Sequence, residues 1–135
     1  MLNKNIEELR EAINEGAEID IIRDDNFTPL LRACNDNSIE IVKLLLDNKA
    51  DVNFVNRDKY TPLMIASQEG HAEVVEVLLK VGAKIDLAKT NGWTTLLIAS
   101  QNGHKEVVEV LLKGRAQINL AATDGATPLY LASKN

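Results

Sequence analysis

A threonine-led segment recurs four times along the chain, and this periodicity constrains the fold more than any other feature. The segments read Thr-Pro-Leu or Thr-Thr-Leu and begin at Thr28, Thr61, Thr94 and Thr127, which are 33 residues apart. Three further columns keep this register: Ala17, Ala50, Ala83 and Ala116; Ala33, Ala66, Ala99 and Ala132; and Ile19, Val52, Ile85 and Ile118. Such a period indicates a repeat array, whose units stack on one another instead of enclosing a single core. The functional question is therefore which repeated surface is free to bind.

The unit that begins at Thr61 shows how each repeat is expected to fold. Thr61 is suited to cap a helix, and Pro62 to occupy its first position, where no backbone N–H is needed. A turn over 68–70 separates this helix from a second one predicted over 71–80, whose apolar residues form a broad face. Alternating residues followed by turn formers over 82–92 predict a projecting, hairpin-like loop. Each unit is thus a helix-turn-helix pair followed by a loop.

The period divides the chain, 1–135, into the units of a single all-α repeat domain. We expect an N-terminal half repeat (1–22), three full repeats (23–55, 56–88 and 89–121) and a truncated C-terminal repeat (122–135). The half repeat follows from the apolar face formed by Ile6, Leu9, Ala12 and Ile13, which indicates a second helix without a first. Such ends are expected either of a fragment of a longer protein or of a minimal natural form with a frayed C-terminus.

The recurring motifs resemble those of the ankyrin repeat family. They are T-P-L-x-x-A, then G-H-x-E-V-V-x-x-L-L and G-A-x-I-D, and together they cover nearly the whole chain. The resemblance implies an all-α repeat solenoid: an elongated, slightly curved stack of helix-turn-helix units joined by projecting hairpin-like loops. It also implies that the loop tips and first helices line a concave face that binds proteins.

The chain departs from the family pattern in several places. Leucine, methionine or tyrosine replaces the histidine that usually follows T-P-L, at Leu31, Met64, Leu97 and Tyr130. Thr95 replaces proline in the third unit. The glycine expected in a left-handed conformation after the second helix is present at Gly16 and Gly82, whereas Lys49 and Arg115 replace it in two other units. Each replacement is expected to cost about 1 kcal/mol.

Charge and composition disfavour several classes of function. The net charge of -5 and the pI near 5.0 argue against a nucleic acid partner, because phosphates are bound mainly by Lys and Arg. No apolar run is long enough to span a bilayer, and residues 1–10 lack the basic and apolar regions of a secretory signal. A cytoplasmic protein is expected, with a secreted effector that has no readable signal as the alternative. Cys34 replaces the serine of other units, which predicts a buried, unpaired thiol.

The sequence predicts no enzymatic activity, no cofactor and no metal site. His71 and His104 occupy equivalent positions of neighbouring units, so helix packing would place them roughly 10 Å apart. Zinc ligands must each lie about 2 Å from one ion, which this separation prevents. No phosphate-binding loop and no nucleophile paired with a base is recognisable. The resemblance to the ankyrin family implies a structural role for both histidines.

An aromatic residue precedes the threonine in three of the units, at Phe27, Tyr60 and Trp93. Stacked units would arrange these residues as a ladder along the loop edge, with roughly 10 Å between neighbours. Two interpretations remain open. Rigidly presented aromatic side chains are common hot spots of protein interfaces, but rings at this position can instead pack on the next loop and stabilise the stack.

The residues predicted to bind a partner lie on the loop tips and on the first helices. On the tips they are Asp25, Phe27, Arg57, Asp58, Tyr60, Asn91, Trp93 and Asp124. On the first helices, Arg32, Ile65 and Ile98, with Leu131 in the same column, are expected to form a partly exposed apolar strip of the concave face. Because these tip residues lean acidic, the sequence favours a partner with a basic patch.

These features favour a non-enzymatic module for protein–protein interaction. One alternative is the targeting arm of a larger enzyme or effector whose catalytic domain is absent from this chain. Another is a structural or self-assembling spacer. A monomer is expected, with end-to-end association as the alternative.

Overall fold

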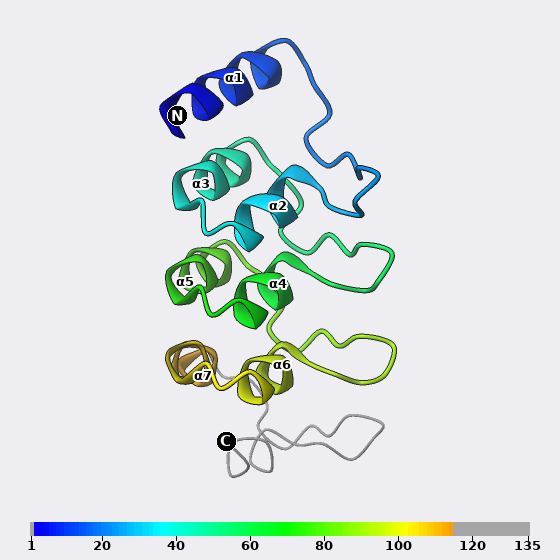
Figure 1. Ribbon diagram of the computed structural model, residues 1–135, viewed down its shortest axis with the longest axis vertical. Helices are drawn as coiled ribbons and strands as arrows, with labels where there is room; N and C mark the ends of the chain where they lie inside the picture. The colour runs from blue at the N-terminus through cyan, green and yellow to red at the C-terminus, as the bar shows by residue number, and fades with distance from the viewer. Residues whose placement is uncertain (1, 115–135) are drawn as a thin grey trace.

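The computed structural model describes residues 2–114, which form a stack of helix pairs (Figure 1). The helices are α1 (Leu2–Asn14), α2 (Pro29–Asn35), α3 (Ile39–Asp47), α4 (Pro62–Gln68), α5 (Ala72–Lys80), α6 (Thr95–Gln101) and α7 (Lys105–Lys113). Within residues 2–114 there is no strand, only an isolated antiparallel bridge between Ala88 and Thr94. The predicted all-α repeat solenoid is confirmed for this part of the chain.

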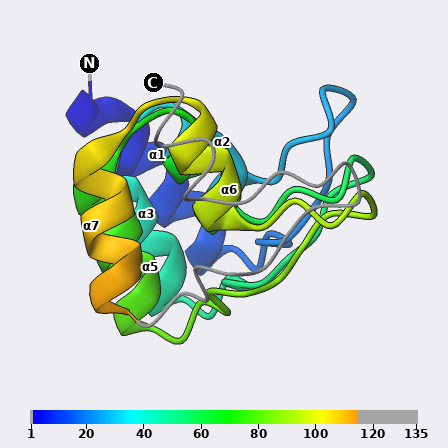
Figure 2. The same cartoon turned by 90° about the horizontal axis from the view of Figure 1, so that it is seen from below.

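The helices form two rows (Figures 1 and 2). The first helices of the units, α2, α4 and α6, follow one another in one row. The second helices, α3, α5 and α7, form the other row, with α1 at its N-terminal end. Helices in equivalent positions pack on one another, α2 on α4, α4 on α6, α3 on α5 and α5 on α7. Equivalent positions of consecutive units are therefore neighbours related by translation.

Threonine begins each first helix as the sequence predicts. The side chains of Thr28, Thr61 and Thr94 accept a hydrogen bond from the backbone N–H three residues later, at 3.2, 3.2 and 3.3 Å. Pro29 and Pro62 then occupy the first helical position. A capping bond of this kind contributes about 1 kcal/mol. Because these helices have only seven residues, packing rather than their own backbone bonds must hold them in place.

One cluster of buried residues runs through all the described units. The largest side chains that are fully buried are Leu30, Leu31, Leu45, Leu63, Met64, Leu78, Leu96, Leu97, Leu111, Val42, Val74 and Val75. Leu31, Met64 and Leu97, which stand where the family pattern has histidine, are thus inside the core. Burying one such side chain contributes about 1.5–3 kcal/mol. These departures place a buried apolar side chain where the family pattern has a hydrogen-bonding one.

The helix α1 ends the row of second helices and packs on α3 (Figure 1). Ile6 is buried, and Leu9 packs against the core cluster, in agreement with the predicted apolar face. Beside α1, the row of first helices begins only with α2. One flank of α1 is therefore left without a helical neighbour among the described residues.

The loops between the units are hairpin-like, as predicted, and they project on the same side of the stack (Figures 1 and 2). A backbone N–H donates across each loop, from Arg23 to the Phe27 carbonyl, from Asn56 to that of Tyr60 and from Lys89 to that of Trp93, at 3.0, 3.1 and 2.9 Å. The bridge between Ala88 and Thr94 occurs only in the third loop. In the first two loops, proline follows the threonine and has no N–H with which to complete such a bridge.

The left-handed position is found where it was expected after α1, α3 and α5. Gly16 and Gly82 adopt φ values of 87° and 95°, and Lys49 adopts 69°. The Lys49 N–H still donates to the Leu46 carbonyl at 3.0 Å, so the turn is kept despite the side chain. Arg115, the other replacement, lies outside the described residues.

We expect Lys49→Gly to raise the free energy of unfolding by about 1 kcal/mol, because glycine adopts a left-handed conformation without steric cost. The midpoint of thermal unfolding, followed by circular dichroism, measures this change. Gly82→Lys is the matched reverse substitution. No atom lies within 4 Å of a Cβ placed on Gly82. Backbone strain alone should therefore lower the midpoint of thermal unfolding of the Gly82→Lys protein. A Lys49→Gly protein that melts no higher than wild type would show that this interpretation of the turn is wrong.

Candidate functional site

The projecting loops bring most of the predicted site residues to one edge of the molecule (Figure 2). We call residues 23–27, 56–60 and 89–93 the tip row. The tip row contains Asp25, Phe27, Arg57, Asp58, Tyr60, Asn91 and Trp93. Asp124, the remaining predicted tip residue, lies outside the described residues. Stacking of the units, rather than proximity in the sequence, brings this set together.

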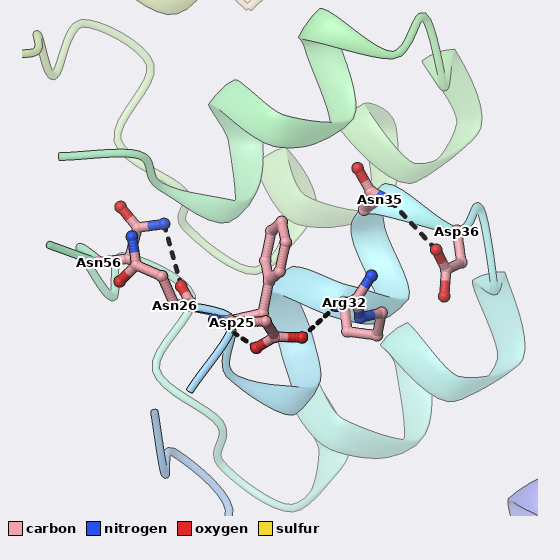
Figure 3. A network of polar contacts seen from close by, with 7 residues as sticks. Asp25, Asn26, Arg32, Asn35, Asp36 and Asn56 are labelled. Atoms are coloured by element: carbon pink, nitrogen blue, oxygen red, sulfur yellow. Dashed lines mark hydrogen bonds and ion pairs between the residues drawn. The ribbon is translucent and has the colours of Figure 1, made fainter. Parts of the chain in front are cut away.

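Asp25, Phe27 and Arg32 form a cluster at the first tip, and Figure 3 labels Asp25 and Arg32. The Asp25 carboxylate forms an ion pair with the Arg32 guanidinium and accepts the Phe27 N–H at 3.1 Å. The guanidinium carbon lies 4.5 Å from the centre of the Phe27 ring, within the range of a cation–π interaction. The Phe27 amide, and next the Arg32 side chain, lower the pKa of Asp25 below its ordinary value. About half of each charged side chain is exposed, so the cluster is accessible to a partner.

Asn56 holds the second tip in shape and links it to the first (Figure 3). It is buried, and its Oδ1 accepts the backbone N–H groups of Asp58 and Tyr60, at 3.0 and 2.9 Å. Its Nδ2 donates to the backbone carbonyl of Asn26 at 3.2 Å. Both ends of this buried amide are therefore hydrogen-bonded, which fixes its orientation and the turn around it.

Asn26 completes the link between the first two tips. Its Oδ1 accepts the Arg57 N–H at 3.1 Å, and its Nδ2 donates to the Asp58 carboxylate at 2.9 Å. Neither Asn26 nor Asn56 was among the predicted site residues. The signal that could have revealed them is the tendency of asparagine side chains in turns to bond nearby backbone groups.

A cationic side chain of the third tip lies over the aromatic ring of the second tip. Lys89 Nζ lies 4.0 Å from the centre of the Tyr60 ring. Within the third tip, the Asn91 Oδ1 accepts the Trp93 N–H at 3.1 Å, as Asp25 does for Phe27 in the first. The turn geometry therefore repeats, whereas the charged partners of the aromatic rings differ between tips.

The aromatic residues of the tip row are neither fully exposed nor fully buried. Phe27, Tyr60 and Trp93 are all half-buried, and Phe27 and Tyr60 pack against the core cluster. The two interpretations made from the sequence are therefore compatible. Each of these two rings contributes to the packing of the stack and still presents part of its surface to solvent.

The expectation of an exposed apolar strip on the first helices is wrong. Ile65 and Ile98 are only 7% and 6% exposed. The helices α4 and α6 bury six of their seven residues, because each is short and packs on the second helix of its own unit and on the adjacent first helix. Leu131 lies outside the described residues, and of the other three Arg32 alone is exposed.

An open hollow of about 450 Å³ lies beside the first tip. Its walls include Leu9 of α1, Ile41 of α3 and the Phe27 ring, and Arg23 and Arg32 lie among its polar residues. The first tip therefore has a concave surface beside its projecting loop.

The histidines connect neighbouring units. The His71 Nε2 lies 3.1 Å from the Asn35 carbonyl oxygen, and the His104 Nε2 lies 2.8 Å from that of Gln68. Because a carbonyl can only accept, Nε2 carries the proton in both rings. Residues 2–114 contain no group of three side chains placed to bind a metal ion. The geometry thus gives both histidines a structural role.

The single cysteine is also part of the packing. Cys34 is fully buried, and burial raises the pKa of its thiol well above the ordinary value. Because the thiolate is the reactive form, this side chain is a poor nucleophile at neutral pH. It replaces a serine of the other units as a small core residue.

A family model for ankyrin repeats, three copies long, matches residues 1–89 and again residues 81–135. The chain belongs to the ankyrin repeat family. Ankyrin repeats are generally modules of protein–protein interaction, and the family is typically non-catalytic. Comparison with curated proteins finds no significant match. Across the described ankyrin units, no helix has the length and apolar character needed to cross a membrane.

Two equivalent glycines of the ankyrin units should respond differently to alanine. Gly70 and Gly103 have φ values of 77° and 71°, so both substitutions carry backbone strain. A Cβ on Gly70 would lie 2.7 Å from His104 Nδ1, whereas nothing lies within 4 Å of one on Gly103. Gly70→Ala must therefore displace the ring from its bond to Gln68.

We expect Gly70→Ala to lower the free energy of unfolding by about 1 kcal/mol more than Gly103→Ala, the approximate worth of the displaced hydrogen bond. Chemical denaturation of the two variants gives this difference directly. Equal losses in the two proteins would mean that the His104 ring moves aside without cost.

Proposed function

We propose that this ankyrin stack is a non-enzymatic module that binds a protein partner through the tip row. The observation that carries the proposal is the arrangement of three half-buried aromatic side chains on one projecting edge, since such side chains dominate many interfaces. The proposed contact residues are Asp25, Phe27, Arg32, Arg57, Asp58, Tyr60, Asn91 and Trp93, with Asp124 as an extension of the set.

Rigid presentation is the proposed mechanism. The loops are closed by backbone hydrogen bonds, and Asn26 and Asn56 tie the first tip to the second. A surface that is already ordered loses little conformational entropy when a partner binds, so more of the contact energy contributes to affinity. Aromatic side chains add to this advantage because they offer a large area with few rotatable bonds.

The proposed surface is narrower than the sequence suggested. Burial removes Ile65 and Ile98 from it, which leaves the loop edge, Arg32 and the hollow beside the first tip. The partner should therefore contact an edge rather than a broad helical face. A monomeric state and a cytoplasmic location remain predictions from the sequence, as do the targeting-arm and spacer alternatives.

Replacing Phe27, Tyr60 and Trp93 together with alanine is expected to abolish partner binding, and Trp93→Ala alone should cost about 2 kcal/mol of binding free energy. Partners captured from the native source by wild type and by the triple variant are compared by quantitative mass spectrometry. The affinity of a captured protein is then measured by titration calorimetry, after circular dichroism has shown that each variant is folded.

Val81→Ala is the matched control, because Val81 is half-exposed and lies at the end of α5, outside the tip row. It should leave affinity unchanged. Undiminished binding by a folded triple variant would rule out the aromatic ladder as the contact surface.

A further inference from the structure

Charge is distributed unequally between the two sides of the stack. The four helices α1, α3, α5 and α7 contain nine carboxylates against six cationic side chains, a balance of -3. The tip row contains Arg23, Arg57, Lys59 and Lys89 against Asp24, Asp25 and Asp58, a balance of +1. The tips project away from the row of second helices (Figures 1 and 2). A chain with a net charge of -5 therefore carries its positive excess on the proposed binding edge.

The carboxylates of this edge are largely engaged within the protein. Asp25 is paired with Arg32, and Asp58 accepts a hydrogen bond from the Asn26 side chain. The cationic groups of the second tip are not engaged in this way. Arg57 and Lys59 are exposed, and neither side chain has an ion-pair partner within residues 2–114. With Arg57 and Lys59 against Asp58, the net charge of the second tip is positive.

The Tyr60 side chain has one cationic group over its ring and two cationic residues in its own turn. Lys89 lies over its ring, and Arg57 and Lys59 belong to the same turn. Two hydrogen bonds to the Asn56 side chain hold this turn, so the backbone of Arg57 and Lys59 is fixed. Lys59 adopts a φ of 67° at the position where the third tip has Gly92. Lysine thus occupies a position on this tip whose backbone conformation favours glycine.

We infer that the partner presents an acidic segment to the second tip, with its carboxylates against Arg57, Lys59 and Lys89 around the Tyr60 ring. This inference rests on the proposed function and names the chemistry of the partner. It reverses the charge expected from the sequence, because that expectation rested on Asp25, Asp58 and Asp124 and did not include Lys59 or Lys89. Exposed cations on a rigid edge accelerate encounter with an anionic partner and disfavour a basic one.

Selection of displayed peptides tests the inference without knowledge of the natural partner. Short linear peptides of random sequence, displayed on phage, are selected on wild type, on an Arg57→Glu, Lys59→Glu, Lys89→Glu variant and on a control variant. The control, Lys80→Glu, Lys105→Glu, Lys113→Glu, makes the same change of net charge at exposed positions of α5 and α7. Circular dichroism and thermal unfolding establish that both variants are folded.

We expect wild type and the control to enrich peptides rich in Asp and Glu, and the tip variant to lose this enrichment. An enriched peptide should bind the tip variant at least about tenfold more weakly than wild type, and its affinity for wild type should fall as salt is added. Selection of neutral or basic peptides by wild type would overturn the inference. So would an equal loss of affinity in the control variant.

Two further measurements separate this inference from the proposed function. Suppose that alanine at Phe27, Tyr60 and Trp93 abolishes peptide binding but charge reversal in the tip variant does not. The tip row is then the binding surface, and the inference of an acidic partner is wrong. Duplex DNA of arbitrary sequence is titrated in parallel. If DNA binds as tightly as the peptide, the cationic side chains recognise phosphate groups rather than carboxylates, and the inference is also overturned.

Discussion

Apolar contact between neighbouring units is the interaction on which the rest of this structure depends. A seven-residue helix such as α4 has too few backbone bonds to persist alone, and it is ordered because its neighbours cover six of its residues. The same requirement translates every position of one unit onto the next. Loops that could have pointed in any direction are thereby placed on one edge, so the binding surface is a consequence of how the core is packed.

Polar contacts between units refine this arrangement at two levels. At the helices, His71 and His104 each reach back to a backbone carbonyl of the preceding unit. At the loops, the Asn56 side chain donates to the Asn26 carbonyl, and the Asn26 side chain accepts the Arg57 N–H of the next tip. The core sets the spacing of the units, and these directional bonds set the orientation of what each unit displays. An edge built in this way presents side chains with little freedom to rearrange.

The repeating features of the fold could be predicted from the sequence because each is specified by local chemistry that recurs. The threonine caps, the turn glycines, the apolar faces and the left-handed Lys49 all follow from residue type and position. The site was less predictable. The exposure of Ile65 depends on how closely adjacent helices approach, and the engagement of Asp58 depends on a residue 32 positions away. The sequence shows which residues recur, but not which of them use their hydrogen-bonding groups on one another.

The bonds that Asn26 forms with Arg57 and Asp58 also bear on how such a surface can change. Two tips that share an amide cannot diversify independently, since a substitution that suits a new partner at one tip shifts the backbone of the other. Effects of substitutions across this pair should therefore be non-additive. The second and third tips are connected in a different way, through the Lys89 side chain over the Tyr60 ring. How substitutions combine along this edge therefore depends on which side chains bridge neighbouring tips.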